Sequence, residues 1–389
     1  MANKRVAVIN TQSFGSTGQI ARAIMNAYQG ESRLFCFRSK ENFDNVTVIG
    51  LNKLSDLMSH AISRIDGNDG FHYRAFTEKL IKELDEYKPD IIHLHNLHGY
   101  YLNVPMLFNY IKEKNIKIIW TLHDFWPLTG RCAIPGDCEN FLTGCQTCLN
   151  KGNYPFAIFH NEKEMFPKRK ELFTSLEDVR VVTPSEYLMN YVKQTHLNKY
   201  PNQVINNGID LDKFFFEESD LKEKLGIPQE KKILLSVMLP VSTHKGIEYI
   251  NKLADELDDK YLILLVGTNP DNFEINPKIK QVPFVPQEEL HLYYSIADLF
   301  INPTLSDTYP TVDMEAVASG LQILSFDTGG SKEIVTPDVG RIVPRKDYEA
   351  FKANIEDMVN HPISKENFFK RRLDFSKDKM IKQYLELYK

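Results

Sequence analysis

The sequence predicts an α/β protein made of two doubly wound, Rossmann-like domains that face each other across a cleft. Three observations lead to this prediction. Short apolar runs that read as strands alternate with segments of helical periodicity, and continuous apolar strands are typical of a parallel sheet covered on both faces. The length of 389 residues is too great for a single core. The alternation also restarts after the segment 204–214, which puts a domain boundary near residue 203.

The first domain is expected to span residues 1–202. Its strands are read from apolar runs and its helices from apolar residues that recur with helical spacing. Ser185 is placed to cap a helix that has Glu186 in its first turn. The expected strands are 5–10, 33–37, 90–95, 117–122 and 179–184, and the expected helices are 20–28, 76–87 and 104–113.

The second domain is expected to span residues 203–363. An aromatic-rich helical segment, 364–389, follows it and can cross back to the first domain. In sheets of this kind, ligands bind beyond the carboxyl ends of the strands. The expected strands are 231–239, 261–267, 298–304 and 322–328, and the expected helices are 246–257, 288–297 and 347–360.

Composition and charge narrow the class of protein. A formal net charge of -5 argues against non-specific nucleic-acid binding, which needs a basic surface. There is no apolar run long enough to span a bilayer. The chain enters a strand at once, without the pattern of a signal peptide, so we expect a cytosolic protein. The basic segments 166–173 and 368–373 suit either anionic lipid at a membrane surface or an ordinary solvated helix face.

The stretch 306–320, SDTYPTVDMEAVASG, places Asp307 in a loop and Glu315 within the helix that follows. Pro310 suits the first turn of this helix, and Gly320 suits its end. The free N–H groups at such a helix start attract an anion such as a diphosphate. Asp307 is then placed to accept hydrogen bonds from a sugar and Glu315 from a ribose; the alternative is a turn residue and a solvated helix residue. The helix start also offers Tyr309, Thr311 and Val312 as donor-binding residues.

One glycine-containing loop follows the first strand of each domain. In the second domain, Lys245 suits a diphosphate and also the charge of a departing nucleoside diphosphate. Its neighbour Gly246 permits close approach of the backbone, and His244 adds a further polar group. In the first domain, Gly15 and Gly18 form a turn at a helix start, although the spacing is neither that of a dinucleotide fingerprint nor that of a P-loop.

Histidines follow two strands of the first domain. His95, His98 and His123 should meet at the carboxyl edge of the sheet. A metal site there is disfavoured, because structural histidines held by hydrogen bonds are more common than ligand sets. Tyr100 is a candidate acceptor-binding residue together with His95 and His98. The rings of Tyr100, Tyr101 and Trp126 suit either stacking on an acceptor sugar or core packing.

Four of the five cysteines lie within an insertion at 132–148. They are spaced C-x5-C-x6-C-x2-C, and glycines between them favour turns. Clustered cysteines in a cytosolic protein suggest a metal rather than disulfides, and four thiolates suit a closed tetrahedral zinc site of structural type. The alternative is a set of reduced thiols in a packed loop. The proposed zinc ligands are Cys132, Cys138, Cys145 and Cys148.

The segment 307–335, DTYPTVDMEAVASGLQILSFDTGGSKEIV, resembles the donor-site signature of glycosyltransferase family 4, whose members are retaining enzymes of the GT-B fold. The resemblance extends over most of the chain. It implies that Asp307 contacts the donor sugar, although the family usually has Glu there, and that Glu315 binds the ribose. It also implies that His123 lies beside the donor sugar and that the Gly15–Gly18 loop lines the catalytic cleft. The cysteine-rich insertion is similar to one in a capsule and exopolysaccharide subset of the family.

The resemblance implies transfer of a sugar, with retention of anomeric configuration, from a UDP- or GDP-linked donor to a hydroxyl of a glycan or lipid-linked acceptor. No catalytic metal is expected, because Lys245 and helix N–H groups supply positive charge. A surface-polysaccharide pathway and peripheral contact with the inner membrane face are expected. Two alternatives remain: a nucleotide-sugar epimerase or phosphorylase of the same fold, and a partner subunit that binds nucleotide-sugar without turnover. Asp307 in place of Glu, and the lack of an arginine upstream of Lys245, keep the non-catalytic partner subunit open as an alternative.

Overall fold

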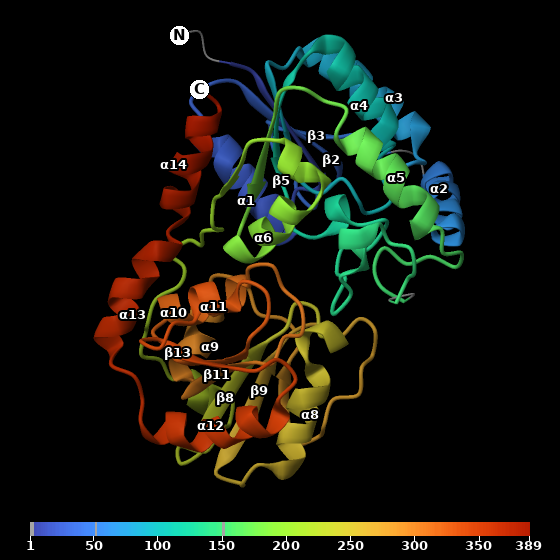
Figure 1. Cartoon of the computed structure of the whole chain (residues 1–389). Coiled ribbons are helices and arrows are strands. Elements are labelled where there is room, and N and C mark those ends of the chain that lie inside the picture. The colour runs from blue at the N-terminus through green and yellow to red at the C-terminus, as the bar shows by residue number, and fades with distance from the viewer. Residues whose placement is uncertain (1–3, 51–52, 150–151) are drawn as a thin grey trace. The chain divides into compact units, whose positions relative to one another are not determined.

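The computed structural model describes residues 4–50, 53–149 and 152–389 (Figure 1). The chain divides into two compact units. Unit 1 comprises Met1–Asn206 and Ile381–Lys389, and unit 2 comprises Asn207–Met380. Within the described ranges, no helix is both long enough and apolar enough to span a bilayer.

Unit 1 is built on a parallel sheet that, in the part of the chain described, has seven strands in the order β3-β2-β1-β4-β5-β6-β7. Every strand pair is parallel. Residues 6–9 of β1 are all buried, as expected for a strand covered on both faces. The strands are β1 Val6–Gln12, β2 Ser32–Arg38, β3 Val46–Val48, β4 Ile91–Leu94, β5 Lys117–Thr121, β6 Val179–Thr183 and β7 Asn202–Val204.

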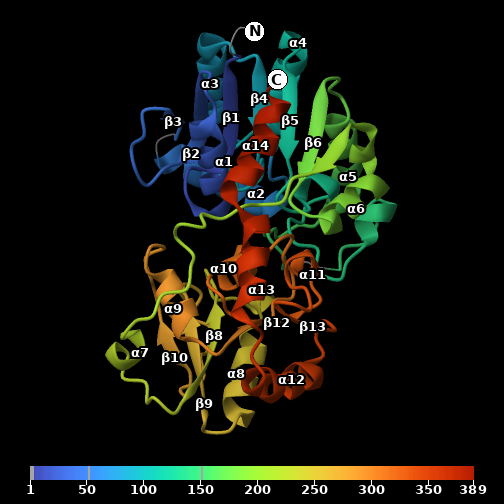
Figure 2. The same ribbon diagram turned by 90° about the vertical axis from the view of Figure 1, so that its left-hand side faces the viewer.

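Helices cover both faces of the unit 1 sheet, with α3 and α4 on one side and α1 on the other (Figures 1 and 2). The Ser185 hydroxyl accepts a hydrogen bond from the N–H of Leu188 at 3.2 Å, which confirms Ser185 as a helix cap. The helices are α1 Gly15–Ala27, α2 Lys53–Asp66, α3 Arg74–Tyr87, α4 Val104–Lys114, α5 Glu162–Phe173 and α6 Glu186–Gln194, with short 3-10 turns η1 Trp126–Leu128, η2 Asn140–Thr143 and η3 His196–Lys199.

Unit 2 repeats the plan with a parallel sheet in the order β10-β9-β8-β11-β12-β13. Along β8, Ile233 and Leu235 pack into the core on one face, and Leu234 packs into the core on the other, because successive side chains of a strand point to opposite faces. The strands are β8 Lys232–Val237, β9 Tyr261–Val266, β10 Lys280–Val282, β11 Leu299–Asn302, β12 Ile323–Phe326 and β13 Gly340–Val343.

The helices of unit 2 follow the strands and end in a segment that returns to unit 1. The helix α14, Lys377–Leu387, begins in unit 2, and its residues from Ile381 onward belong to unit 1. The predicted pair of doubly wound parallel sheets is therefore confirmed. The remaining helices are α7 Leu221–Lys224, η4 Thr243–Lys245, α8 Ile247–Glu256, α9 Leu290–Ile296, α10 Thr311–Ala318, α11 Ser331–Ile334, α12 Tyr348–Asn360, α13 Lys365–Arg371 and η5 Arg372–Phe375.

Candidate functional site

The loops after β8 and β11 carry the central pair of charges in unit 2. β8 and β11 are neighbours in the sheet, so their carboxyl ends open at the same edge. Lys245 Nζ lies 2.6 Å from Asp307 Oδ2, and Asp307 Oδ1 accepts a hydrogen bond from the N–H of Tyr309 at 3.1 Å. The structure thus brings together two residues that are far apart in sequence and that were both predicted to serve the donor site.

The ion pair is partly open to solvent, with side-chain exposures of 28% for Lys245 and 21% for Asp307. Burial by itself would lower the pKa of Lys245, but the Asp307 carboxylate outweighs it and the pKa is raised. The ammonium group therefore stays charged at neutral pH. A fixed cation that solvent can still reach is well suited to a phosphate group.

The helix α10 begins beside this pair. Pro310 stands as its N-cap residue, one position before the first turn, with φ −69°. Tyr309 is buried, and burial raises the pKa of its hydroxyl. Thr311 and Val312 form the first turn and are partly exposed. The free N–H groups of this turn thus lie close in sequence to Asp307, as the predicted anion site requires.

Glu315 lies inside α10 and is 8% exposed, so it is not the solvated helix residue of the alternative interpretation. Tyr294 donates a hydrogen bond from its hydroxyl to Glu315 Oε2 at 3.0 Å. Burial raises the pKa of Glu315 to about 7, and the bond from Tyr294 opposes that rise. The bond from Tyr294 thus engages Oε2 of this carboxylate.

Backbone packing explains two of the glycines near the ion pair. Gly246 has φ +83°, and a Cβ there would overlap the carbonyl oxygen of Pro303. Gly329 has φ +57°, and a Cβ there would overlap the carbonyl oxygen of Asp307. The loops that follow β8, β11 and β12 are therefore in direct contact. Only glycine permits this approach, which fixes the backbone of Asp307.

His244 takes part in the same packing through its backbone. Its carbonyl oxygen accepts hydrogen bonds from the N–H of Leu305 at 2.7 Å and from the hydroxyl of Thr304 at 3.2 Å. Burial, and then the charge of Lys245, lower the pKa of the His244 ring. His244 is therefore neutral at pH 7 and adds no cation beside Lys245.

Two further polar residues of unit 2 were not predicted. Asp313 is fully buried and accepts a hydrogen bond from the Asn302 amide at 2.7 Å; burial raises its pKa to about 7. Arg345 follows β13 and donates to the carbonyl oxygen of Leu305 at 3.0 Å. It adds a cation at the carboxyl edge, where sequence analysis found no arginine upstream of Lys245. The strand β13 was not among the predicted strands, so the residues that follow the predicted strands do not include Arg345.

The corresponding edge of unit 1 carries the Gly15–Gly18 turn. Gly15 has φ +70°, and a Cβ on Gly18 would lie 2.5 Å from the carbonyl carbon of Ser13, so the turn folds tightly against the start of α1. The next strand in the sheet, β4, leads to His95, whose N–H donates to the carbonyl oxygen of Ile9 at 3.0 Å. The glycine turn and the histidines thus follow neighbouring strands, β1 and β4.

Three histidine rings lie against one another at the ends of β4 and β5. His95 Nδ1 and His123 Nε2 are 2.9 Å apart, and the His93 and His95 ring centroids are 4.3 Å apart. Burial lowers the pKa of His123 to about 4 and that of His93 to about 3. These rings are neutral at pH 7, so His123 can donate or accept a hydrogen bond but does not supply a cation.

His98 behaves differently because it faces a carboxylate. His98 Nε2 lies 2.6 Å from Asp124 Oδ2. Burial would lower the pKa of His98, but Asp124 outweighs it and the pKa is raised. His98 Nδ1 lies 3.4 Å from the hydroxyl of Tyr154, and the N–H of Tyr100 donates to the buried carboxylate of Asp69 at 3.0 Å. Asp69 and Tyr154 were not predicted, because neither belongs to the histidine motifs.

Some predicted site residues are core residues instead. Tyr101 and Trp126 are fully buried, and the Arg169 guanidinium lies 3.7 Å from the centre of a Trp126 ring. Neither ring is available for stacking on a sugar. Arg169 is itself 1% exposed, so the basic segment 166–173 does not present this arginine to lipid. Tyr100 is 7% exposed.

The four clustered cysteines of unit 1 line one small cavity, together with Thr129, Phe141 and Glu162. The cavity lies in the segment that follows β5 and η1, next in sequence to His123 and Asp124. Cys36 stands apart in β2, where it is fully buried. All four residues that were predicted as zinc ligands therefore line this cavity.

The two units and their sites define a class of protein. A pair of parallel α/β units is the architecture of the GT-B glycosyltransferases, and solved structures agree. Sucrose-phosphate synthase from Thermosynechococcus elongatus superposes with a TM-score of 0.73 at 17% identity, covering 99% of this chain and 98% of its own. The Anabaena protein HepE, in complex with UDP-glucose, gives a TM-score of 0.69 at 14% identity, covering 99% of each chain.

Family models identify both halves of the chain. The model described as Glycosyltransferase Family 4 matches residues 32–213, and the model described as Glycosyl transferases group 1 matches residues 217–374. A protein of Escherichia coli K12 named as a colanic acid biosynthesis glycosyl transferase, WcaC, is 24% identical over 324 residues, which are 77% of this chain and 76% of that protein. The chain belongs to the family 4 type of GT-B glycosyltransferases.

Proposed function

We propose that this chain is a retaining glycosyltransferase that takes a sugar from a UDP- or GDP-linked donor. The observation that supports this most directly is the arrangement in unit 2 of the Lys245–Asp307 pair, 2.6 Å apart, beside the start of α10, with Glu315 buried inside that helix. One cation, one helix start and two carboxylates match the diphosphate, the sugar and the ribose of such a donor. HepE, which shares the fold, is described in complex with UDP-glucose.

In this proposal each group of unit 2 has one partner on the donor. Lys245 and the free N–H groups of α10 bind the diphosphate and stabilise its charge as it leaves. The Asp307 carboxylate, which now pairs with Lys245, accepts a hydrogen bond from a hydroxyl of the donor sugar. Glu315 Oε1 accepts a hydrogen bond from a ribose hydroxyl. Positive charge comes from Lys245 and Arg345, so no catalytic metal is assigned a role.

The proposed transfer breaks the bond between the anomeric carbon and the diphosphate oxygen. A bond from the acceptor hydroxyl oxygen to that carbon forms on the same face, which retains the anomeric configuration. The acceptor proton passes to the leaving diphosphate. His123, neutral because burial lowers its pKa to about 4, serves as a hydrogen-bonding group for the donor sugar rather than as an acid. Its bond with His95 fixes the ring orientation.

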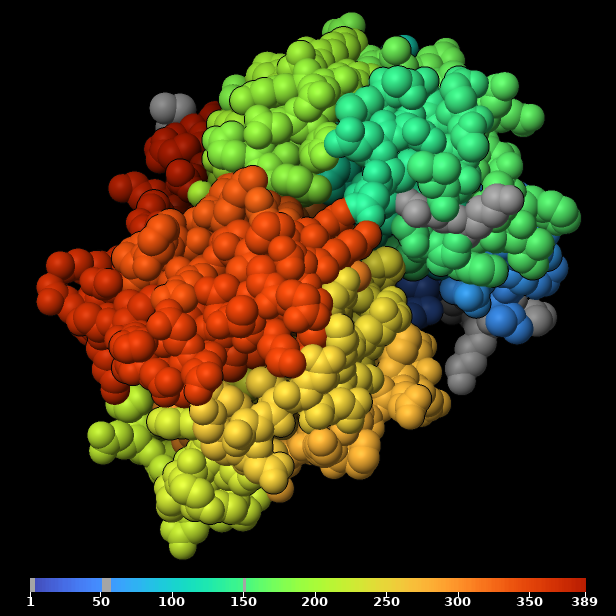
Figure 3. Space-filling model, turned by 60° about the horizontal axis from the view of Figure 1, so that its bottom comes forward, coloured from blue at the N-terminus to red at the C-terminus, as the bar shows by residue number. Residues whose placement is uncertain are grey.

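The acceptor is proposed to bind unit 1 at His95, His98 and Tyr100 and to carry an apolar tail. An exposed apolar face lies next to Tyr100, whose hydroxyl donates to the carbonyl oxygen of Phe156 at 3.1 Å. The helix α2 pairs with the segment 156–159 through the N–H of Ile158, which donates to the carbonyl of Arg64 at 2.8 Å. Figure 3 shows α2 in blue beside this green segment. Large exposed apolar patches mark interaction sites. The face comprises Leu57, Met58, Ile62, Ile65, Phe156, Ile158 and Phe159.

This apolar face supports a lipid-linked acceptor at the inner face of a membrane, in the synthesis of a bacterial surface polysaccharide such as a capsule. WcaC, named for colanic acid biosynthesis, supports the pathway class. The basic segment 368–373 contributes less than predicted. Arg372 there donates to the carbonyl oxygen of Leu211 at 2.7 Å, and Arg371 donates to that of Glu333. Glu315→Gln tests the donor part of the proposal, and Phe159→Glu tests the acceptor part.

The test begins with binding. UDP, GDP, ADP, CMP and their sugar conjugates are titrated by calorimetry, and a single nucleotide should bind wild type and bind Glu315→Gln more weakly. Turnover is then measured with lipid-linked and water-soluble acceptors, and the anomeric configuration of the product is read by NMR. Phe159→Glu should raise KM for the lipid-linked acceptor alone. An inverted product contradicts the mechanism, and binding without turnover on any acceptor favours a non-catalytic partner subunit.

A further inference from the structure

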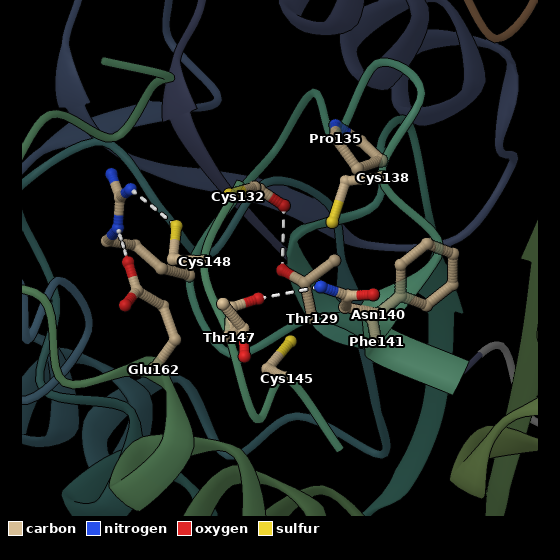
Figure 4. Close-up of a pocket in the computed structure, with 11 residues that line it drawn as sticks. Thr129, Cys132, Pro135, Cys138, Asn140, Phe141, Cys145, Thr147, Cys148 and Glu162 are labelled. Carbon is tan, nitrogen blue, oxygen red and sulfur yellow. Dashed lines mark hydrogen bonds and ion pairs between the residues drawn. The ribbon is translucent and has the colours of Figure 1, made fainter. Parts of the chain in front are cut away.

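Four cysteine residues line one cavity in the segment between β5 and α5. Its volume is about 20 Å³, and Cys132, Cys138, Cys145 and Cys148 all line it, which is room for a single ion or water molecule. Figure 4 shows the sulfur atoms of Cys138 and Cys145 directed toward the space between the loops. We propose that these four thiolates bind one zinc ion, which has a structural role and is independent of the transfer reaction.

The local backbone turns bring the cysteines to the cavity. Gly136, with φ +61°, turns the chain before Cys138, whose N–H donates to the carbonyl of Pro135 at 3.1 Å. Gly144, with φ +96°, ends η2, and Cys145 follows with φ +51°. A left-handed conformation at a residue other than glycine costs free energy and persists where surrounding contacts impose it. A metal bond at Cys145 is a contact of that kind.

Hydrogen-bond donors already face two of the sulfur atoms. The N–H of Gly130 lies 3.3 Å from Cys145 Sγ, and Arg131 Nη2 lies 4.0 Å from Cys148 Sγ. Such donors can orient metal ligands and hold them in place. Four thiolates and one Zn²⁺ leave a net charge of −2, since −4 and +2 are combined, and Arg131 offsets part of it.

A second set of ligands competes for the same metal. Cys148, His160 and Glu162 bring one ligand atom each to within 4.8 Å of one another, and among the described residues only this trio does so. The Glu162 carboxylate is already engaged, however, because Arg131 Nε lies 2.7 Å from its Oε1. Zinc–sulfur bonds of about 2.3 Å require the four sulfurs to draw together around the ion, and thiolates are preferred ligands of structural zinc.

The zinc ion would hold a segment that supports the acceptor side of unit 1. The N–H of Phe125 donates to the carbonyl of Ala133 at 3.0 Å, and the N–H of Ala133 donates to that of Tyr154 at 2.9 Å. Tyr154 in turn contacts His98. Four protein ligands fill the tetrahedron, so no position is left for a reacting water. Binding releases the thiol protons to solvent.

The test measures metal in the full-length protein after exchange into metal-free buffer. We expect about one zinc per chain by mass spectrometry. The zinc content should be retained in Cys36→Ala and His160→Ala and should fall at least fivefold in Cys138→Ser. A Cys36→Ala control removes a buried cysteine but leaves the cluster intact. Loss in His160→Ala with retention in Cys138→Ser assigns the metal to the competing trio and overturns the proposal.

A wild-type measurement covers the case in which Cys138→Ser does not fold. A mercurial reagent titrates the thiols while a zinc indicator follows release of the metal. Zinc release that is complete only after four equivalents supports four thiolate ligands, and release after one equivalent contradicts them. Purified wild type that contains no zinc and takes up none from a buffer of zinc chloride also overturns the proposal.

Discussion

At the residue scale, the Lys245–Asp307 pair gives the most direct prediction. Lys245→Met and Asp307→Asn should each lower kcat/KM by about 10²–10³-fold, the usual effect of removing one preorganised charge from a transition state. Asp307→Glu keeps the charge and should lose less. The control is Lys213→Met, which breaks an exposed ion pair of unit 2, 3.0 Å from Glu288. If Lys245→Met has the same kcat/KM as wild type under the same initial-rate conditions, Lys245 has no role in the reaction.

Glu315 links donor binding to pH-dependent stability. Its folded pKa of about 7 exceeds the value of about 4.3 in an unfolded chain. The folded state therefore binds this proton more tightly, so its stabilising contribution is complete below pH 4 and is lost as pH rises to 7. Glu315→Gln cannot ionise and can still accept the bond from Tyr294. It should be more stable than wild type at pH 8 and equally stable at pH 4.

The same substitution should weaken nucleotide binding, by about 10–100-fold for the loss of a hydrogen bond to a charged group. Unfolding followed by circular dichroism at pH 4, 6 and 8, and calorimetric titration with the nucleotide, measure the two effects. Glu349→Gln, on a side chain that is 80% exposed, is the control. A variant that loses both affinity and stability at pH 8 would instead indicate that Glu315 only supports the helix.

The acids of the donor site differ in how far their environment can be read from sequence. Asp307 and Glu315 were predicted because their spacing around Pro310 follows from helix geometry and from the family signature. Asp313, two residues before Glu315 in the same helix, was not predicted as a site residue and is fully buried. Its carboxylate accepts a hydrogen bond from Asn302, which lies eleven positions earlier, in strand β11. Spacing within one element does not reveal such a partner.

At the element scale, contact between loops makes Gly329 sensitive to substitution. A Cβ on Gly329 would overlap the carbonyl oxygen of Asp307, whereas a Cβ on Gly226 meets nothing within 4 Å. Both glycines have similar positive φ values, +57° and +64°, so alanine adds comparable backbone strain at each. Gly329→Ala should therefore lower kcat/KM and Tm more than Gly226→Ala does, because only Gly329→Ala displaces Asp307. Equal losses of both quantities would contradict this account.

The elements themselves were predicted where burial is continuous. β1, β4 and β5 in unit 1, and β8, β9, β11 and β12 in unit 2, are apolar runs packed on both faces, and each was predicted. The edge strands β3, β7 and β10 have three residues each, and three residues carry no recognisable period. Helix α1 begins at Gly15, earlier than the predicted start at residue 20, because Gly15, Ser16 and Thr17 are weak helix formers.

At the scale of the whole molecule, the chain crosses between the units twice, after Asn206 and after Met380. The sequence suggested the second crossing but could not identify its contacts, because helical periodicity gives a buried face and not its partner. In unit 1, Tyr388 is 2% exposed, and its hydroxyl lies 2.7 Å from His93 Nδ1. His93 Nε2 lies 2.8 Å from the hydroxyl of Thr121. Thr121 is the last residue of β5, the strand that leads to His123.

These contacts predict that the last turn of the chain stabilises unit 1. Tyr388→Ala should lower the free energy of unfolding of unit 1 by about 3–5 kcal/mol, as for other large aromatic side chains removed from a core. Tyr388→Phe, which keeps the ring and loses the bond to His93, should cost about 1 kcal/mol.

Both tryptophans of the chain, Trp120 and Trp126, lie in unit 1, so tryptophan fluorescence during urea unfolding reports this unit selectively. Leu373→Ala, on a side chain of unit 2 that is 62% exposed, is the control and should leave the tryptophan transition in place. If Tyr388→Ala also leaves it in place, the terminal segment does not form part of the cooperative core of unit 1.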